Sequence, residues 1–134
     1  MQPVSPRIVE LFNGWSSGQK TQVQALLDSD APVITVVAKS DVRHVKEALR
    51  TTDEENLAMV RDTVAHLVAH GRRVFLDCEH FFDGYATDPD YGVRLLSEAA
   101  AAGMSVGVLC DTNGGMLPSR IHAIVADVAA RSGV

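Results

Sequence analysis

The sequence predicts an α/β domain built on a parallel sheet. Three apolar runs rich in β-branched residues are separated by segments in which apolar residues recur at helical spacing. The runs lack strict alternation of apolar and polar residues, which is typical of strands covered on both faces. Strand and helix alternate three times, and this order requires parallel strands joined by right-handed crossovers. The predicted strands are residues 32–38, 73–78 and 105–110.

Helix start and stop signals flank each predicted strand. Thr52 and Glu55 have the spacing of a capping box, and the helix that they open is expected to end at Gly71. A second helix opens with Asp88-Pro89 and runs to Gly103, a third runs from Pro118 to about Gly133, and a fourth precedes the first strand at about residues 20–28. The inward positions expected in the first three helices are Leu57, Val60, Val64, Leu67 and Val68; Leu95, Leu96 and Ala99; and Ile121, Ile124, Val125 and Val128.

Composition restricts the classes of function. The chain has 134 residues, is 46% hydrophobic and carries a net charge of −5, which suits one globular domain. Without a Lys/Arg cluster, a nucleic-acid surface is not expected. No apolar run approaches the roughly 18 residues of a membrane span, and residues 1–4 lack the pattern of a signal peptide. Cys78 and Cys110 each end a strand-like run and are interpreted as reduced thiols in a cytoplasmic protein.

Polar residues gather at the carboxyl ends of the three predicted strands, which is where parallel α/β folds bind ligands. The opposite ends carry plain residues, so this asymmetry predicts a site at one edge of the sheet. The residues at the three carboxyl ends are Lys39, Ser40 and Asp41, with His44 a turn later; Asp77, Glu79 and His80; and Asp111, Thr112 and Asn113.

The residues alone leave the chemistry of this edge open. The stretch VFLDCEHFFDG places Asp77, Glu79, His80 and Asp83 beside two phenylalanines, and it is compatible with a metal site, a catalytic carboxylate or an ordinary turn. His66 and His70 have the four-residue spacing of a zinc site. They lie away from the apolar stripe, however, and are interpreted as surface histidines.

Three stretches are long enough to indicate a family: VVAKSDVRHVKEALRTTDEENLAMVRDTV, EHFFDG and CDTNGG. Together they resemble the citramalate synthase branch of the 2-isopropylmalate synthase and HMG-CoA lyase superfamily. The resemblance implies a (β/α)8 barrel that condenses acetyl-CoA with a 2-keto acid, pyruvate in this branch, with the help of a divalent metal (Mg or Mn, possibly Zn). A 2-isopropylmalate synthase or an HMG-CoA-lyase-like enzyme is the alternative within the superfamily.

Two segments of that family are missing from this sequence. These are the Asp-Thr-Thr-Leu-Arg-Asp-Gly segment, which supplies a metal-binding Asp and a catalytic Arg, and a later His-x-His pair. The resemblance therefore implies that residues 1–134 form a single partial TIM-barrel domain of three consecutive βα units, about the fourth to the sixth. We expect the isolated chain to be inactive, to hold no metal by itself, and to form a homo-oligomer through exposed strand edges. A non-catalytic, self-associating barrel segment is the alternative from another class of function.

Site roles follow from the resemblance position by position. Glu79 matches the glutamate involved in proton transfer, and Thr112 matches the threonine that binds the carboxylate of the keto acid. His44, Ser40 and Asn113 are also expected to bind the substrate. Two further expectations concern the neighbours of Glu79. Phe81 and Phe82 are expected to form apolar walls whose desolvation raises the pKa of Glu79, and His80 and Asp83 are expected to support the loop.

Overall fold

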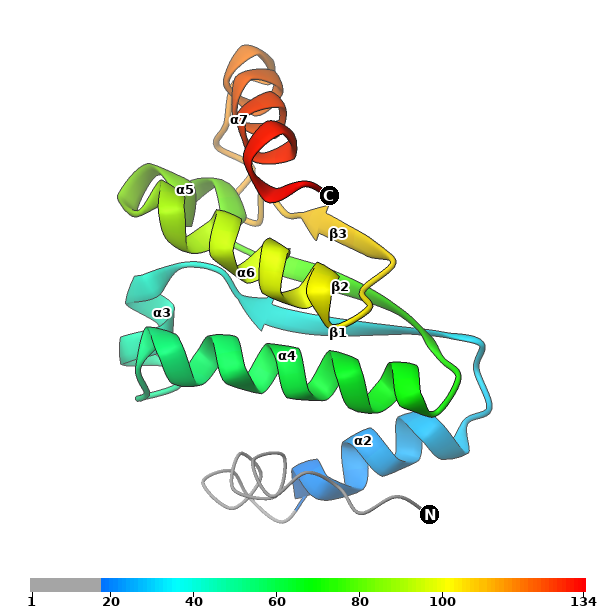
Figure 1. The fold of residues 1–134 in the computed structure, drawn as a ribbon. Helices are drawn as coiled ribbons and strands as arrows, with labels where there is room; N and C mark the ends of the chain where they lie inside the picture. Colours follow the sequence, from blue (N-terminus) through cyan, green and yellow to red (C-terminus); the bar gives the residue numbers. More distant parts are fainter. Residues whose placement is uncertain (1–17) are drawn as a thin grey trace.

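Three parallel strands form one sheet in the computed structural model, which describes residues 18–134. The strands are β1 (Val33–Lys39), β2 (Arg73–Glu79) and β3 (Val106–Leu109), in the spatial order β1-β2-β3. The helices are α2 (Gly18–Asp28), α3 (Val42–Glu47), α4 (Asp53–Ala69), α5 (Phe81–Thr87), α6 (Pro89–Ala101) and α7 (Pro118–Ser132). This element order confirms the predicted α/β class with parallel strands (Figure 1).

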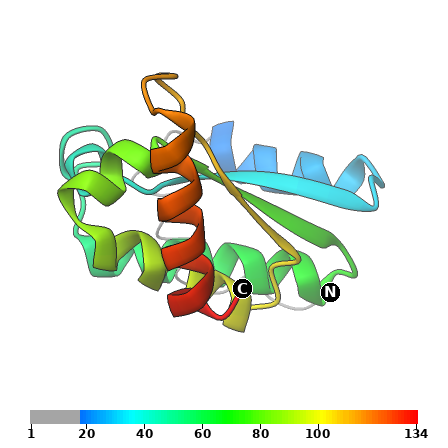
Figure 2. The same ribbon diagram turned by 90° about the horizontal axis from the view of Figure 1, so that it is seen from above.

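One face of the sheet is covered by helices. Helices α4 and α6 lie side by side on the same side of the strands in both views (Figures 1 and 2). Alternate residues of β1 and β2 point into this layer and are buried. Gly107 lets β3 approach the same layer, because a Cβ there would lie 2.6 Å from Leu96 Cδ2. The buried strand residues on this face are Ile34, Ala38, Val74, Leu76 and Cys78.

The opposite face of the sheet is open over the described residues. The parallel register sets Val37 beside Asp77, and Asp77 beside Val108. Val37 is 61% exposed and Val108 is 36% exposed. The prediction that the strands are covered on both faces is therefore wrong for residues 18–134. Valine at these two positions would suit a buried face, yet no described helix or strand packs against them.

The predicted helix caps are confirmed for α4 and α6. Thr52 Oγ1 accepts a hydrogen bond from the Glu55 N–H at 3.2 Å, and Asp88 Oδ1 accepts from the backbone of Tyr91 at 3.1 Å. The prediction that Val68 and Val125 point into the core is wrong. Val68, in the last turn of α4, is 36% exposed. Val125 is 42% exposed because α7 packs only one side against α5 and α6.

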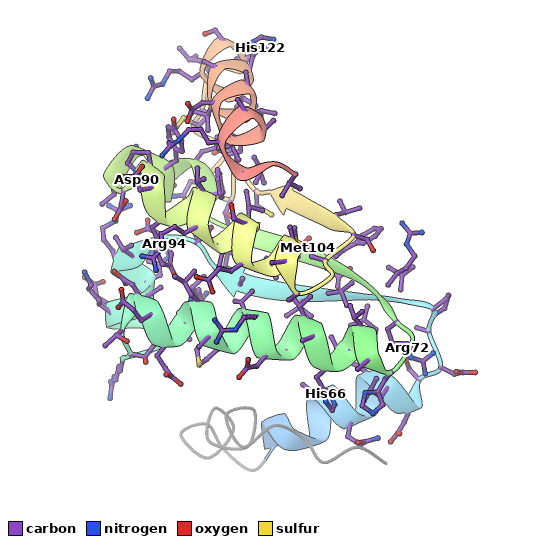
Figure 3. All side chains as sticks on the ribbon, viewed as in Figure 1. His66, Arg72, Asp90, Arg94, Met104 and His122 are labelled. Atoms are coloured by element: carbon purple, nitrogen blue, oxygen red, sulfur yellow. The ribbon has the colours of Figure 1, made fainter. Side chains whose placement is uncertain are left out.

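Helix α2 begins at Gly18, slightly earlier than predicted, and its carboxyl end is tied to the turn before β2. The Arg72 guanidinium donates a hydrogen bond to the Leu27 carbonyl oxygen at 2.9 Å and pairs with Asp30 at 3.2 Å. Figure 3 shows Arg72 beside α2. Over residues 18–134, no helix is both long and apolar enough to cross a membrane.

Candidate functional site

The carboxyl ends of the three strands meet at one rim, as the sequence predicts. Ser40 follows β1, Glu79 ends β2, and Thr112 lies three residues beyond the end of β3. Hydrogen bonds join the rim across the strands. Ser40 Oγ donates to the Glu79 carbonyl oxygen at 2.6 Å, and the His80 N–H donates to Thr112 Oγ1 at 2.8 Å. The structure therefore brings these three predicted site residues together.

Glu79 forms an ion pair with Lys39, its register partner at the end of β1. The hydrogen bond from Lys39 lowers the pKa of Glu79 and outweighs the burial that by itself would raise it. The expectation that neighbouring phenylalanines raise this pKa is therefore wrong. Phe81 and Phe82 are buried in the core, 0% and 2% exposed, rather than forming walls around the carboxylate.

His80 separates the carboxylate from these core phenylalanines. Its backbone has φ +56°, a left-handed conformation that few non-glycine residues adopt, and it occupies the N-cap position of α5 without a capping side-chain hydrogen bond. The turn leaves Glu79 on the open side of the sheet while Phe81 enters the core.

The histidines and the loop after β3 complete the rim. The His44 and His80 rings meet edge to face with their centroids 4.6 Å apart. The Asp83 carboxylate lies 3.9 Å from His80 Nδ1 and accepts a hydrogen bond from Asn113 Nδ2 at 2.7 Å. His80 and Asp83 therefore contact each other and the neighbouring loop, as expected for residues that support it.

The loop after β3 is a turn that presents Thr112 and Asn113. The Gly114 N–H donates to the Asp111 carbonyl oxygen at 2.9 Å, and the Asp111 carboxylate accepts from the Met116 N–H at 3.1 Å. Thr112 and Asn113 lie at the two central positions of this turn and are exposed. The Thr112 hydroxyl, which accepts from His80, can still donate its own proton to an anion.

Sequence reasoning gave no role to several residues that hold the rim in place. Asn56, only 2% exposed, donates to the Lys39 carbonyl oxygen at 3.0 Å and to the Tyr91 hydroxyl at 2.5 Å. The sequence does indicate that Asn56 is buried, because Asn56 falls four residues before Val60 on the apolar stripe of α4. A polar residue on a buried stripe requires a buried partner.

Asp41 and Gly84 shape the segment that leads from Ser40 into α3, the helix that carries His44. The Asp41 side chain is fully buried, caps α3 by accepting from the Arg43 N–H at 2.9 Å, and binds the Arg43 guanidinium. This pairing lowers the pKa of Asp41. At Gly84, a Cβ would lie 2.5 Å from the Ser40 carbonyl oxygen, so α5 packs directly on the loop backbone.

The other candidate sites have weaker support from the structure. Across residues 18–134, no three His, Cys, Asp or Glu side chains are grouped so that they could hold a metal ion. The His66 and His70 rings lie 4.4 Å apart on α4 (Figure 3 labels His66), and His70 Nδ1 contacts the His66 carbonyl oxygen. Cys78 and Cys110 are free, and burial raises the pKa of the Cys78 thiol to about 12. A thiol with that pKa is a poor nucleophile.

Comparison with known proteins places the sequence in a family. The chain is 62% identical over 120 residues to the (R)-citramalate synthase of Streptomyces coelicolor, covering 90% of this chain and 22% of the relative. It is 46% identical over 110 residues to the (R)-citramalate synthase of Aquifex aeolicus, covering 82% and 21%. A 2-isopropylmalate synthase of Prochlorococcus marinus is 29% identical over 120 residues, covering 86% and 22%.

No family model matches the chain. The chain spans about a fifth of the length of the curated relatives that it matches. Identity to the citramalate synthases reaches 62%, against 29% for the 2-isopropylmalate synthase. By sequence, the chain therefore belongs to the citramalate synthase branch of a family that also contains 2-isopropylmalate synthases.

Proposed function

We propose that this chain is a segment of an acyltransferase that condenses acetyl-CoA with pyruvate to give citramalate. The observation that carries the proposal is the rim itself. A chain 62% identical to an (R)-citramalate synthase brings Glu79, Thr112 and His44 to the same rim at the carboxyl ends of parallel strands. In this reaction the acetyl methyl group loses a proton and bonds to the keto carbon, the ketone oxygen gains a proton, and water cleaves the thioester to release CoA.

Glu79 is the proposed base that takes the methyl proton. The reaction needs a carboxylate within reach of the C–H bond. The ion pair with Lys39 holds Glu79 in the ionised form and also lowers its basicity. Glu79 lies on the open side of the sheet, at the rim where a substrate can approach. Its place at the end of β2 fixes the backbone from which the carboxylate extends.

Thr112, His44 and Asn113 are proposed to bind the keto acid. The exposed Thr112 hydroxyl donates to the substrate carboxylate in this proposal. His44, half-buried beside His80, supplies a second polar contact. Asn113 steadies the turn through its hydrogen bond to Asp83.

Ser40 is proposed to act through Glu79 rather than by touching the substrate. Its side chain is only 1% exposed, and its hydroxyl proton is donated to the Glu79 carbonyl oxygen. A buried hydroxyl committed in this way fixes the backbone of its partner. Ser40 is therefore a positioning residue in this proposal.

A divalent metal is implied by the resemblance, but residues 18–134 do not provide a fitting set of ligands. We propose that residues of the parent enzyme outside this sequence hold it. The (β/α)8 barrel, of which residues 1–134 would form about the fourth to sixth βα units, would bring those residues to the same rim. The free cysteines fit a reducing compartment such as the cytoplasm.

The same rim could serve a 2-isopropylmalate synthase, which takes a 2-keto acid carrying an isopropyl group. The lower identity to that enzyme disfavours this alternative. The second alternative, a self-associating segment without catalysis, concerns the isolated chain. It is supported by the open sheet face, and we expect the isolated chain to release no CoA.

A chimeric enzyme tests the proposed function. The aligned segment of the Streptomyces coelicolor enzyme is replaced by this chain, and thiol release from acetyl-CoA is followed with pyruvate or with the isopropyl-substituted keto acid, in Mg²⁺ or Mn²⁺. We expect turnover with pyruvate and little with the larger keto acid. The unmodified enzyme is the positive control, and the isolated chain is assayed in parallel. A folded chimera without turnover contradicts the proposal.

A further inference from the structure

We propose that Lys39 is the residue that aims the Glu79 carboxylate for proton transfer, as a positioning residue of the candidate site. The inference rests on the proposed function, in which Glu79 is the base, and it adds a second residue to that step. Its geometric basis is the last residue pair in the register of β1 and β2. Lys39 and Glu79 are the terminal residues of β1 and β2, lie opposite each other in the parallel register, and pair through Nζ and Oε2.

Buried side chains fix the backbones of both partners. Asn56 donates to the Lys39 carbonyl oxygen at 3.0 Å, and Ser40 donates to the Glu79 carbonyl oxygen at 2.6 Å. Asn56 and Ser40 are 2% and 1% exposed, so water does not compete for either of these hydrogen bonds. Surface ion pairs contribute little when two free side chains must be ordered to form them. Here both Cα positions are held, so the pair is part of the architecture of the rim.

The other titratable groups around Glu79 do not replace Lys39. His44 and His80 add smaller favourable interactions with the carboxylate, and Lys39 is the group that hydrogen-bonds to it. The hydrogen bond from Lys39 is the largest cause of the lowered pKa of Glu79. The titratable groups that act on Glu79 are Lys39 on β1, His44 on α3 and His80 before α5, and Cys110 after β3 is itself affected by Glu79. Asp77 lies two residues before Glu79 on β2, on the same face of the strand.

This arrangement has two consequences for proton transfer. Lys39 engages Oε2, so the other oxygen, Oε1, is the one that this proposal assigns to the incoming C–H group. Once Glu79 accepts a proton, the carboxyl group is neutral and the ion pair with the ammonium is lost. Loss of the pair favours passing the proton on, because the ammonium stabilises only the ionised form. Lys39 thus favours the ionised form of Glu79, which restores the base after each transfer.

The titration of Glu79 tests this role without any need for turnover. In the 134-residue chain with ¹³C-labelled glutamate, the side-chain carboxyl signal of Glu79 is followed against pH. We expect Lys39→Met and Lys39→Gln to move the Glu79 midpoint to higher pH, and Lys39→Arg to retain the low midpoint. Lys46→Met is the matched control, because Lys46 is exposed and lies 4.0 Å from Asp53, away from Glu79. Circular dichroism establishes that each variant is folded.

In the chimeric enzyme, Lys39→Met is expected to move the acid limb of the kcat profile to higher pH, with Lys39→Arg restoring it. A folded Lys39→Met or Lys39→Gln chain with an unchanged Glu79 midpoint overturns the inference. So does a variant that raises only the KM for pyruvate, since that result makes Lys39 a substrate contact. If the unmodified chimera is inactive, the proposed function fails, while the titration still decides the role of Lys39.

Discussion

Gly84 marks the tightest approach between α5 and the loop that carries Ser40. A Cβ at this position would lie 2.5 Å from the Ser40 carbonyl oxygen and 2.9 Å from Asp41 Cα, both backbone atoms that cannot rotate away. We expect Gly84→Ala to lower the free energy of unfolding by about 1–3 kcal/mol, a typical cost of overpacking. Thermal and denaturant unfolding measure the loss.

Gly115→Ala is the matched control for this substitution. A Cβ on Gly115 meets no atom within 4 Å, so the unfolding free energy should stay close to that of the unmodified chain. Equal stability of the two alanine variants would contradict the packing described at Gly84.

Asp41 should give the chain an acid-sensitive stability. Its pairing with Arg43 lowers its pKa in the folded state below the ordinary value of 3.8. The unfolded chain therefore binds a proton more readily, and the stabilisation is fully present above that ordinary value and lost as the pH falls through the folded pKa. We expect Asp41→Asn to flatten this acid limb in unfolding experiments from pH 5 down to about 2.

Arg43→Gln separates the ion pair from the helix cap in the same experiment. It removes the guanidinium but leaves the Asp41 carboxylate to cap α3, so the folded pKa of Asp41 moves back towards its ordinary value and the acid loss of stability should become smaller and end at a higher pH. An acid limb that neither variant changes would contradict the role given to this pair.

The residue types predicted which side chains lie at the rim, but they did not predict the charge interactions between those side chains. Polar residues at three strand ends predicted where Ser40, Glu79 and Thr112 would meet. The pKa of Glu79 was predicted in the wrong direction, because the neighbouring phenylalanines in the sequence turn into the core at His80. The dominant partner, Lys39, is 40 residues away in sequence and becomes a neighbour only through the register of β1 and β2.

Helix α4 joins the rim to α6 through one buried amide. Asn56 donates to the end of β1 and to the Tyr91 hydroxyl of α6. We expect Asn56→Ala to lower the unfolding free energy by about 1–3 kcal/mol, because the Lys39 carbonyl group and a buried hydroxyl lose their partner. Tyr91→Phe should cost less, since Asn56 keeps its bond to the strand. Chemical denaturation that ranks the two variants in the opposite order would contradict this link.

The long elements were predictable and the short ones were not. Caps at Thr52 and Asp88 and the apolar periodicity of α4, α6 and α7 gave helices at the observed places. The short helices α3 and α5 were missed, because six or seven residues are too few to show a periodic stripe. Both follow strand ends and are held by tertiary contacts, such as the packing of Gly84 on the Ser40 backbone.

The open face of the sheet predicts self-association of the isolated chain. Exposed Val37 and Val108 lie on that face, and within residues 18–134 the outer edges of β1 and β3 pair with no other strand. We expect light scattering to give a mass of at least two chains of 14.4 kDa. Val37→Lys should shift the distribution towards the monomer.

Val125→Lys is the matched control, because Val125 is similarly exposed but lies on α7. It should leave the mass unchanged. A folded monomer of 14.4 kDa would show that the open face does not drive association.

The proposed function requires Glu79 to act as a base within a larger enzyme. The most direct measurement is kcat of the chimeric citramalate synthase carrying Glu79→Gln, with acetyl-CoA and saturating pyruvate. Glutamine keeps the shape and removes the basic oxygen, so kcat should fall by about 10²–10⁴-fold with the fold intact. A Glu79→Gln enzyme that is folded and turns over at nearly the rate of the unsubstituted chimera would contradict the account.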